Sequence, residues 1–165
     1  MELDAFNRLD ADAARAVVRP CVDIDRWVDA VVAGRPYATR AALLDTARTS
    51  AAPWTPAEID GALAHHPRIG ERPSGGGAAA SLSRSEQEGI GMPPADVVAA
   101  LAAGNRAYEE KFSRVFLIRA AGRSADEILD ALNERLAHTE EEEIPVVAEQ
   151  LRQIAIRRLE GIIDS

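Results

Sequence analysis

The chain has 165 residues, of which 47% are hydrophobic and only 4% aromatic, and its formal net charge is −8. This length suits one domain with its own hydrophobic core, so we expect a single domain over residues 1–165. The negative charge argues against a nucleic-acid partner, because proteins that bind phosphate backbones normally present a basic surface.

The apolar residues are mainly Ala, Leu, Ile and Val, a mixture that favours helices over strands. We therefore predict an all-α fold, a single-domain helical bundle of about seven to eight helices. Cys21 is the only cysteine in the sequence, so no intrachain disulfide can form and a reducing compartment is favoured. The sequence shows no signal-peptide pattern and no apolar run near the ~20 residues that span a bilayer, and we expect a cytoplasmic protein without a membrane partner.

The first half of the chain predicts four helices, over 11–19, 24–33, 39–49 and 56–65. Asp10 can cap the first of them. Thr55-Pro56-Ala57-Glu58 has the capping-box spacing, with proline at the first helical position of the fourth. Pro67 should stop that helix, because the residue before a proline is pushed out of the α region. His66 is then expected at a helix C-terminus, where the helix dipole favours the protonated ring.

Residues 70–81 are rich in Gly and show no periodicity, so they predict a flexible loop. We interpret this loop as a mobile lid rather than a phosphate cradle, because no Gly-Lys-Ser/Thr follows it. The segment Ser83-Arg84-Ser85-Glu86 has the spacing of a second capping box. It predicts that the next helix begins there and ends between Gly89 and Pro94.

The second half predicts a long amphipathic helix over 95–112, followed by two helices that Ser124 and Thr139 can cap. Asn105 lies on the apolar stripe of the long helix, either as a buried polar anchor or beneath a site. The run 115–118 is expected to be a buried connector whose backbone amides could meet a ligand. The glutamates at 140–143 suit a positive helix N-terminus and predict a solvated face.

One arginine interrupts the apolar face of the last helix. Four apolar residues and Arg158 recur at intervals of three or four, and so share one face: Val147, Leu151, Ile154, Arg158 and Ile162. A buried guanidinium must be paired or hydrogen-bonded. Either Arg158 pairs with a core carboxylate or reaches the surface, or it recognises an anion or a carbonyl in a pocket.

These residues suggest acid/base chemistry without a metal. His66, Glu86 and Arg158 form a minimal acid/base and anion-binding set. His65 and His66 are adjacent, and the sequence has no His-x-x-x-His and no pair of cysteines, so no metal site is expected. The Gly-x-Ser-x-Gly motif of serine nucleophiles is also missing. The residues alone indicate a small cofactor-free acid/base enzyme, and the alternative is an acidic helical module that binds a protein partner without catalysis.

Five segments taken together resemble, in order and spacing, the 2-oxo-4-hydroxy-4-carboxy-5-ureidoimidazoline (OHCU) decarboxylases of urate degradation. The segments are His66-Pro67-Arg68-Ile69-Gly70, Ser83-x-x-Glu86-Gln87, Asn105-x-x-Tyr108-x-x-Lys111-Phe112, Phe116-Leu117-Ile118 and Ile154-x-x-x-Arg158-Leu159. The resemblance implies an all-α, cofactor-free, usually homodimeric enzyme that turns OHCU into (S)-allantoin and carbon dioxide. It implies that His66, Glu86 and Arg158 are catalytic. The substrate contacts that it implies are Pro67, Ser83, Arg84, Ser85, Glu86, Gln87, Phe116, Leu117, Ile118, Arg119 and Ala120.

Overall fold

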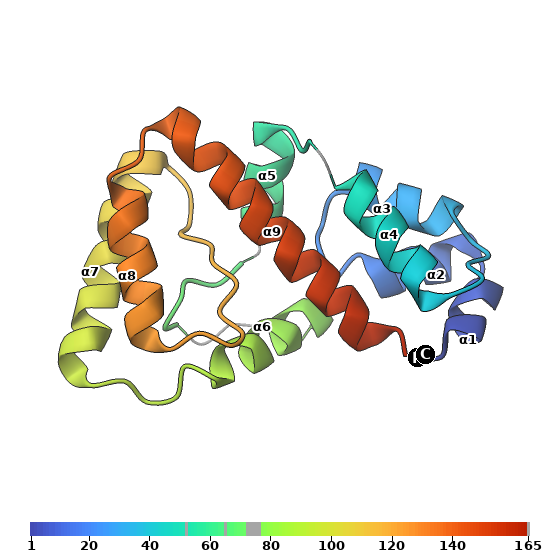
Figure 1. Cartoon of the computed structure of the whole chain (residues 1–165), viewed down its shortest axis with the longest axis horizontal. Coiled ribbons are helices and arrows are strands. Elements are labelled where there is room, and N and C mark those ends of the chain that lie inside the picture. Colours follow the sequence, from blue (N-terminus) through green and yellow to red (C-terminus); the bar gives the residue numbers. More distant parts are fainter. Residues whose placement is uncertain (52, 65, 72–76, 165) are drawn as a thin grey trace. The chain divides into compact units, whose positions relative to one another are not determined.

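The computed structural model describes residues 1–51, 53–64, 66–71 and 77–164. Over these residues the chain forms nine helices, α1 to α9, and no β-strand (Figure 1). The prediction of an all-α fold is confirmed. No helix in the described part of the chain combines the length and the apolar character that a membrane span requires.

The chain divides into two compact units. The first consists of Met1–Ala62 with Leu151–Ser165, and the second of Leu63–Gln150. Helix α9 (Glu140–Ile162) is continuous and contributes to both units, and α5 (Pro56–Leu63) ends at the first residue of the second unit. The expectation of one domain over 1–165 stays a prediction.

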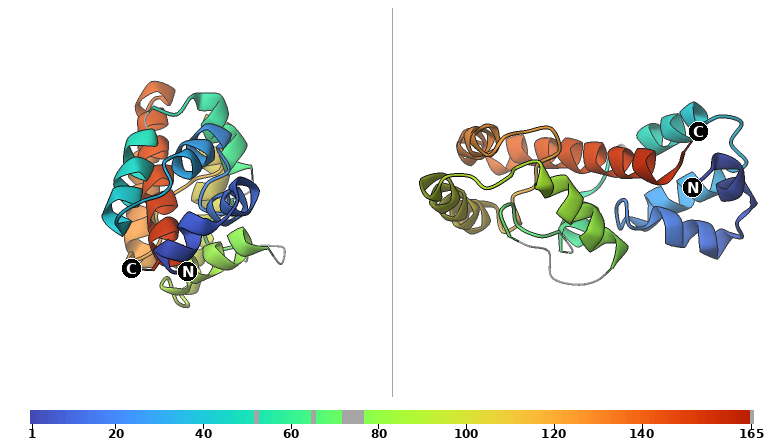
Figure 2. Two further views of the ribbon diagram at one scale, coloured as in Figure 1. Left: turned by 90° about the vertical axis from the view of Figure 1, so that its right-hand side faces the viewer. Right: turned by 90° about the horizontal axis from the view of Figure 1, so that it is seen from below.

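The first unit is built from the helices that the first half of the sequence predicts, preceded by one short additional helix. Its elements are α1 (Leu3–Arg8), α2 (Ala11–Val18), α3 (Asp25–Ala33), α4 (Arg40–Ser50), α5 (Pro56–Leu63) and the C-terminal part of α9 (Glu140–Ile162). The Asp10 carboxylate caps α2 by accepting from the Ala13 N–H at 2.8 Å. The N-terminal amino group donates to Asp164 Oδ2 at 2.8 Å, so the two ends of the chain lie side by side (Figure 2).

The second unit contains the long amphipathic helix. Its elements are α6 (Ala78–Glu88), α7 (Ala95–Phe112), α8 (Ala125–Leu136) and the N-terminal part of α9. Ser124 and Glu127 form the predicted capping box at the start of α8. Helices α7 and α8 pack closely at Gly104, where an added Cβ would lie 2.4 Å from Leu132 Cδ2. Glycine at this position therefore lets the two helices approach one another.

The predicted start of α6 is wrong. The helix begins at Ala78 with Gly77 as its N-cap, so Ser83 lies in the helix interior and is buried. Ser83 and Glu86 are one helical turn apart, which is the same spacing as in a capping box. The alanines at 78–80 are strong helix formers and extend the helix toward the N-terminus.

The core of the second unit joins Ile69 to side chains of the continuous stretch 101–132. Residue Ile69, helices α7 and α8, and the connector after α7 contribute to one cluster of buried side chains. Its members are Ile69, Leu101, Tyr108, Phe112, Phe116, Ile118, Ala120, Ile128 and Leu132. The prediction that the run 115–118 is a buried connector is confirmed for Phe116, Leu117 and Ile118.

Candidate functional site

His66 follows the end of α5 and begins an irregular segment. The helix ends at Leu63, slightly earlier than predicted, and the His66 N–H donates to the Leu63 carbonyl at 2.9 Å. The His66 side chain is half-buried. The backbone N–H of His66 is therefore bonded to the last residue of the helix. His65 lies outside the described residues, as do 72–76 of the predicted loop.

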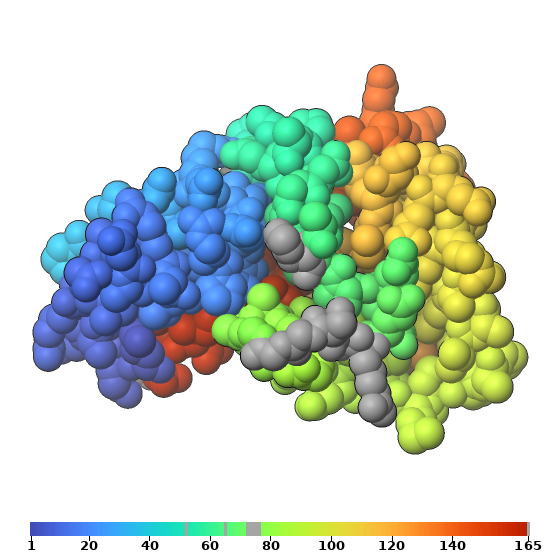
Figure 3. Space-filling model, turned by 180° about the vertical axis from the view of Figure 1, so that it is seen from behind, coloured from blue at the N-terminus to red at the C-terminus, as the bar shows by residue number. Residues whose placement is uncertain are grey.

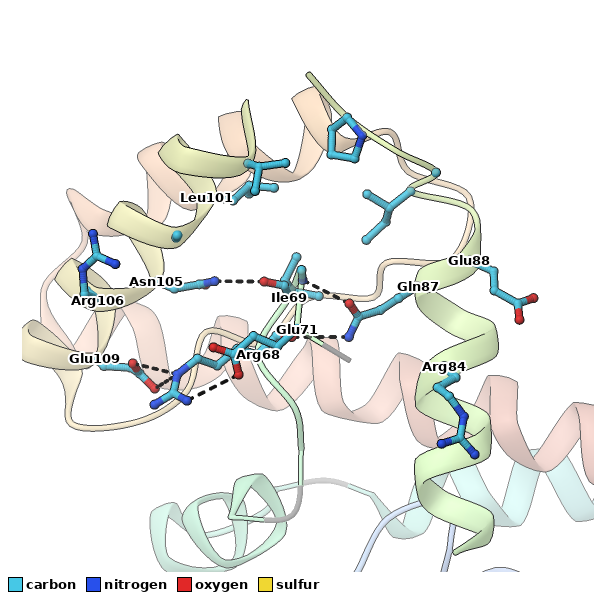
Figure 4. Close-up of a pocket in the computed structure, with 16 residues that line it drawn as sticks. Arg68, Ile69, Glu71, Arg84, Gln87, Glu88, Leu101, Asn105, Arg106 and Glu109 are labelled. Carbon is cyan, nitrogen blue, oxygen red and sulfur yellow. Dashed lines mark hydrogen bonds and ion pairs between the residues drawn. The ribbon is translucent and has the colours of Figure 1, made fainter. Parts of the chain in front are cut away.

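The segment after His66 lies between α6 and α7 (Figure 3). Gln87 accepts from the Gly70 N–H at 3.0 Å and donates to the Arg68 carbonyl at 3.4 Å. Asn105 Nδ2 donates to the Ile69 carbonyl at 3.0 Å (Figure 4). Asn105 is 5% exposed and hydrogen-bonded, so it is a buried polar anchor, and it also lines the pocket described below, so both interpretations of this residue hold.

The expected site residues of α6 lie on two different faces of the helix. Glu86 and Gln87 follow Ser83 by three and four positions and so lie on the same side of the helix, where Ser83 is buried and the other two are half-buried. Arg84 and Ser85 are exposed, and the Arg84 guanidinium donates to Ser81 Oγ at 3.0 Å. The substrate contacts expected of this helix are therefore not all on one face.

The connector 116–120 is held by side chains from α8 and α9. Arg135 Nη1 donates to the Leu117 carbonyl at 2.6 Å. Gln150 Oε1 accepts from the Arg119 N–H at 3.0 Å. The backbone amides expected to meet a ligand are those of 115–118, and this expectation stays a prediction; the amide of Arg119, the next residue, already has a partner within the chain.

A buried charged cluster lies behind the connector, and the sequence analysis missed it. Glu143 is 0% exposed, so the prediction of a solvated face over 140–143 is wrong for this residue. Glu143 Oε1 accepts from Tyr108 Oη at 2.5 Å and from Arg135 Nε at 2.7 Å, and Oε2 lies 2.8 Å from His138 Nδ1. Burial, followed by the hydrogen bond to Glu143, raises the pKa of Tyr108, which keeps this hydroxyl a donor. Glu143 precedes Val147 by four positions, and this spacing could have placed it on the buried face of α9.

A pocket with a volume of about 870 Å³ lies on the side of segment 68–71 that faces α7 and the end of α6. Figure 4 shows Ile69, Leu101 and Gln87 around it. Arg84 and Gln87, two of the expected substrate contacts, are among its lining residues: Arg68, Ile69, Gly70, Glu71, Arg84, Gln87, Glu88, Ile90, Gly91, Pro93, Val98, Leu101, Ala102, Asn105, Arg106 and Glu109.

Arg158 belongs to the first unit. Its side chain is 4% exposed, which confirms that it points inward from α9. Its Nη1 donates to the Pro20 carbonyl at 3.1 Å. Among the described residues, no group of three or more His, Cys, Asp or Glu side chains is arranged to hold a metal ion.

Comparison with known proteins identifies the family. The family model described as OHCU decarboxylase matches residues 7–160. A crystal structure of an OHCU decarboxylase in the presence of (S)-allantoin is 25% identical, with a TM-score of 0.74 over 88% of this chain and 96% of that chain.

A crystal structure of (S)-allantoin synthase shares the fold, with 16% identity and a TM-score of 0.73 over all of this chain and 55% of that chain. No match was found among curated protein sequences. Because the family model covers nearly the whole sequence, this chain belongs to the OHCU decarboxylase family.

Proposed function

We propose that this protein removes carbon dioxide from OHCU and forms (S)-allantoin in urate degradation, without a cofactor. The family match over residues 7–160 is the observation that carries this proposal. A second observation supports it: the segments 66–70, 83–87 and 116–120, which contain most of the expected site residues, lie in the same compact unit. Gln87 connects the first two segments, and the shared core connects the first with the third.

The reaction requires two tasks of the protein. OHCU carries a hydroxyl and a carboxylate on one ring carbon, next to a carbon with imine character that can accept the electron pair when carbon dioxide leaves. The intermediate must then be protonated on one face to give a single enantiomer. The protein must stabilise the charge that develops on the ring and deliver a proton from a fixed direction.

The residues of the family pattern can be given roles in these tasks. We assign proton transfer near the hydroxyl and the carboxylate to His66. We assign to Glu86 the binding of the ureido or ring N–H groups of the substrate. Because Glu86 lies inside α6, it does not have the capping role that the sequence suggested. Arg158 would bind a substrate oxygen, for which a planar guanidinium is suited. Pro67 and the backbone of 116–120 would contact the substrate.

Two further properties belong to the same proposal. We propose a homodimer, which the family resemblance supports, and light scattering of the purified protein would measure it. We also propose a cytoplasmic location, which the single cysteine supports, since Cys21 is buried and cannot form an intrachain disulfide.

The test is the optical activity of the product. OHCU also decays to racemic allantoin without enzyme in this family's chemistry, so the amount of allantoin alone is a poor measure. Freshly prepared OHCU is mixed with the protein, and both the rate of loss and the circular dichroism of allantoin are followed. We expect faster loss of OHCU and an excess of the (S) enantiomer.

The control is the variant His66→Ala. With this variant, OHCU should be lost at the uncatalysed rate and give racemic allantoin, while the far-UV circular dichroism of the protein remains that of the wild type. Racemic allantoin formed at the uncatalysed rate by the wild-type protein would refute the proposed function. An acidic protein-binding module would give this result.

A further inference from the structure

We infer that Arg135 and Gln150 are positioning residues: they fix the orientation of the connector 116–120, and through it the backbone groups that meet the substrate. This inference rests on the proposed function, which gives the backbone of 116–120 a contact with the substrate. Arg135 comes from α8 and Gln150 from α9, and the connector runs beside both helices (Figure 1). Neither residue is among the expected catalytic or substrate-binding residues.

The side chains of the connector alternate, which indicates an extended backbone. Every second side chain belongs to the core cluster of the second unit, and these side chains are Phe116, Ile118 and Ala120. Leu117 is buried outside that cluster, and Arg119 is half-buried. A period of two is typical of extended chain, in which successive side chains point to opposite faces. Because residues 115–120 belong to no helix or strand, contacts from other elements must hold them in place.

The contacts from Arg135 and Gln150 fall on one edge of this extended segment. Arg135 Nη1 donates to the Leu117 carbonyl at 2.6 Å, and Gln150 Oε1 accepts from the Arg119 N–H at 3.0 Å. In extended chain the N–H and the carbonyl of one residue point to the same edge, and those of the next residue point to the opposite edge. The backbone groups of Leu117 and Arg119 therefore turn toward α8 and α9. Those of Ile118 turn to the opposite edge, and it is this edge that the substrate would meet.

Arg135 is itself held in a fixed orientation. Its side chain is 6% exposed, and its Nε donates to Glu143 Oε1 at 2.7 Å. Its Cζ lies 4.6 Å from the centre of the Phe116 ring, so the guanidinium also packs on the connector. The guanidinium is planar and presents its donors in a rigid fork, so a bond from Nε to the carboxylate also sets the direction of Nη1. The buried Glu143 thus directs Arg135 to the Leu117 carbonyl, in addition to pairing with its charge.

The experiment uses substitutions that loosen each contact separately. Gln150→Leu removes the acceptor of the Arg119 N–H, whereas Gln150→Glu keeps an oxygen that can accept from it. Arg135→Lys keeps a positive charge beside Glu143 but has a single nitrogen in place of the fork. Asn133, an exposed residue of α8, provides the matched control Asn133→Leu, which also replaces a side-chain amide by leucine but away from the connector.

Three properties are measured for each protein: the hydrogen-exchange rate of the Arg119 amide by NMR, the kcat and KM for OHCU, and the enantiomeric excess of the allantoin formed. The enzyme concentration is raised for each variant until OHCU is consumed well before its uncatalysed decay. KM and the enantiomeric excess do not depend on how much of a variant is folded, so they separate positioning from stability.

In Gln150→Leu we expect Arg119 exchange to become about tenfold faster and kcat/KM to fall about tenfold, since a factor of this size accompanies the loss of one hydrogen bond. KM should rise and the excess of (S)-allantoin should fall, because the connector no longer holds the substrate in one orientation. Arg135→Lys should also raise KM and lower the excess. Gln150→Glu and Asn133→Leu should match the wild type in all three measurements. If Arg135→Lys does not fold, the two Gln150 variants suffice for the test.

A wild-type KM and a wild-type enantiomeric excess in Gln150→Leu would overturn the inference and leave both residues a structural role only. An unchanged Arg119 exchange rate in the same variant would also overturn it, because the contact would then not hold the connector. If Gln150→Glu is as impaired as Gln150→Leu, the accepting oxygen does not explain the effect and the inference fails. If the wild-type protein leaves OHCU unchanged, the proposed function fails, whereas the Arg119 exchange rates still confirm or refute the hold on the connector.

Discussion

Replacing Glu143 by Gln should destabilise the protein strongly. The substitution keeps the size of the side chain and removes its charge. In the wild type, the carboxylate is fully buried and accepts from Arg135 and Tyr108 through Oε1, while Oε2 lies next to His138. The amide of Gln can still accept from some of these groups, but the Arg135 guanidinium is left buried without a counter-charge.

Breaking one partner of a buried ion pair typically costs about 3–5 kcal/mol. We expect a loss near the lower end of that range, about 3 kcal/mol, because the glutamine oxygen remains an acceptor. For a chain of this length each kcal/mol lowers Tm by about 2–4 °C, so Tm should fall by about 6–12 °C. A loss of about 3 kcal/mol is a large fraction of the 5–15 kcal/mol by which an ordinary domain is stable.

Urea unfolding followed by circular dichroism measures this loss. The control is Glu141→Gln, which makes the same chemical change at an exposed position of the same glutamate run and should stay within about 0.5 kcal/mol of the wild type. A second check is the double variant Arg135→Met with Glu143→Gln, which should lose less stability than the sum of the two single variants. If Glu143→Gln is as stable as Glu141→Gln, the buried pair does not stabilise the fold and our reasoning is wrong.

Three further predictions concern other parts of the molecule. Gly104→Ala should reduce the free energy of unfolding by about 1–3 kcal/mol, because the added Cβ would overlap Leu132. A denaturant titration that gives the wild-type free energy of unfolding would show that α7 and α8 can separate at no cost. Arg158→Lys should lower kcat/KM by about tenfold or more with little change in Tm, because lysine lacks the planar two-point contact; normal turnover by Arg158→Lys, together with unfolding of Arg158→Met in mild denaturant, would instead assign this residue to the core. The hydrogen bond from Arg26 lowers the pKa of Glu58 from 4.5 to about 2, so the stability it provides is present above pH 4.5 and is lost as the pH falls toward 2. Arg26→Ala should lose this part of the acid dependence in urea titrations, and an unchanged pH profile would contradict the pairing.

The sequence by itself determined the features that depend on neighbouring residues. Asp10 and Ser124 cap their helices as predicted, because a capping side chain bonds the backbone only two or three positions away. The inward direction of Arg158 followed from helical periodicity alone. Local spacing gave a wrong prediction for the start of α6 at Ser83, because one helical turn separates Ser83 from Glu86 whether the pair begins a helix or lies inside one.

Only the tertiary structure decided what each buried polar group contacts. The four glutamates at 140–143 are alike in sequence, yet Glu143 alone among them is buried. Its partners Tyr108 and Arg135 come from two other helices, so no local pattern could reveal them. The same holds for Gln87 and Asn105: their positions on helix faces could be counted from the sequence, but their contacts with 68–70 depend on α6 and α7 packing on either side of that segment. Helix formation is set by interactions within a few residues, whereas the pairing of buried polar groups is set by which elements the hydrophobic core brings together.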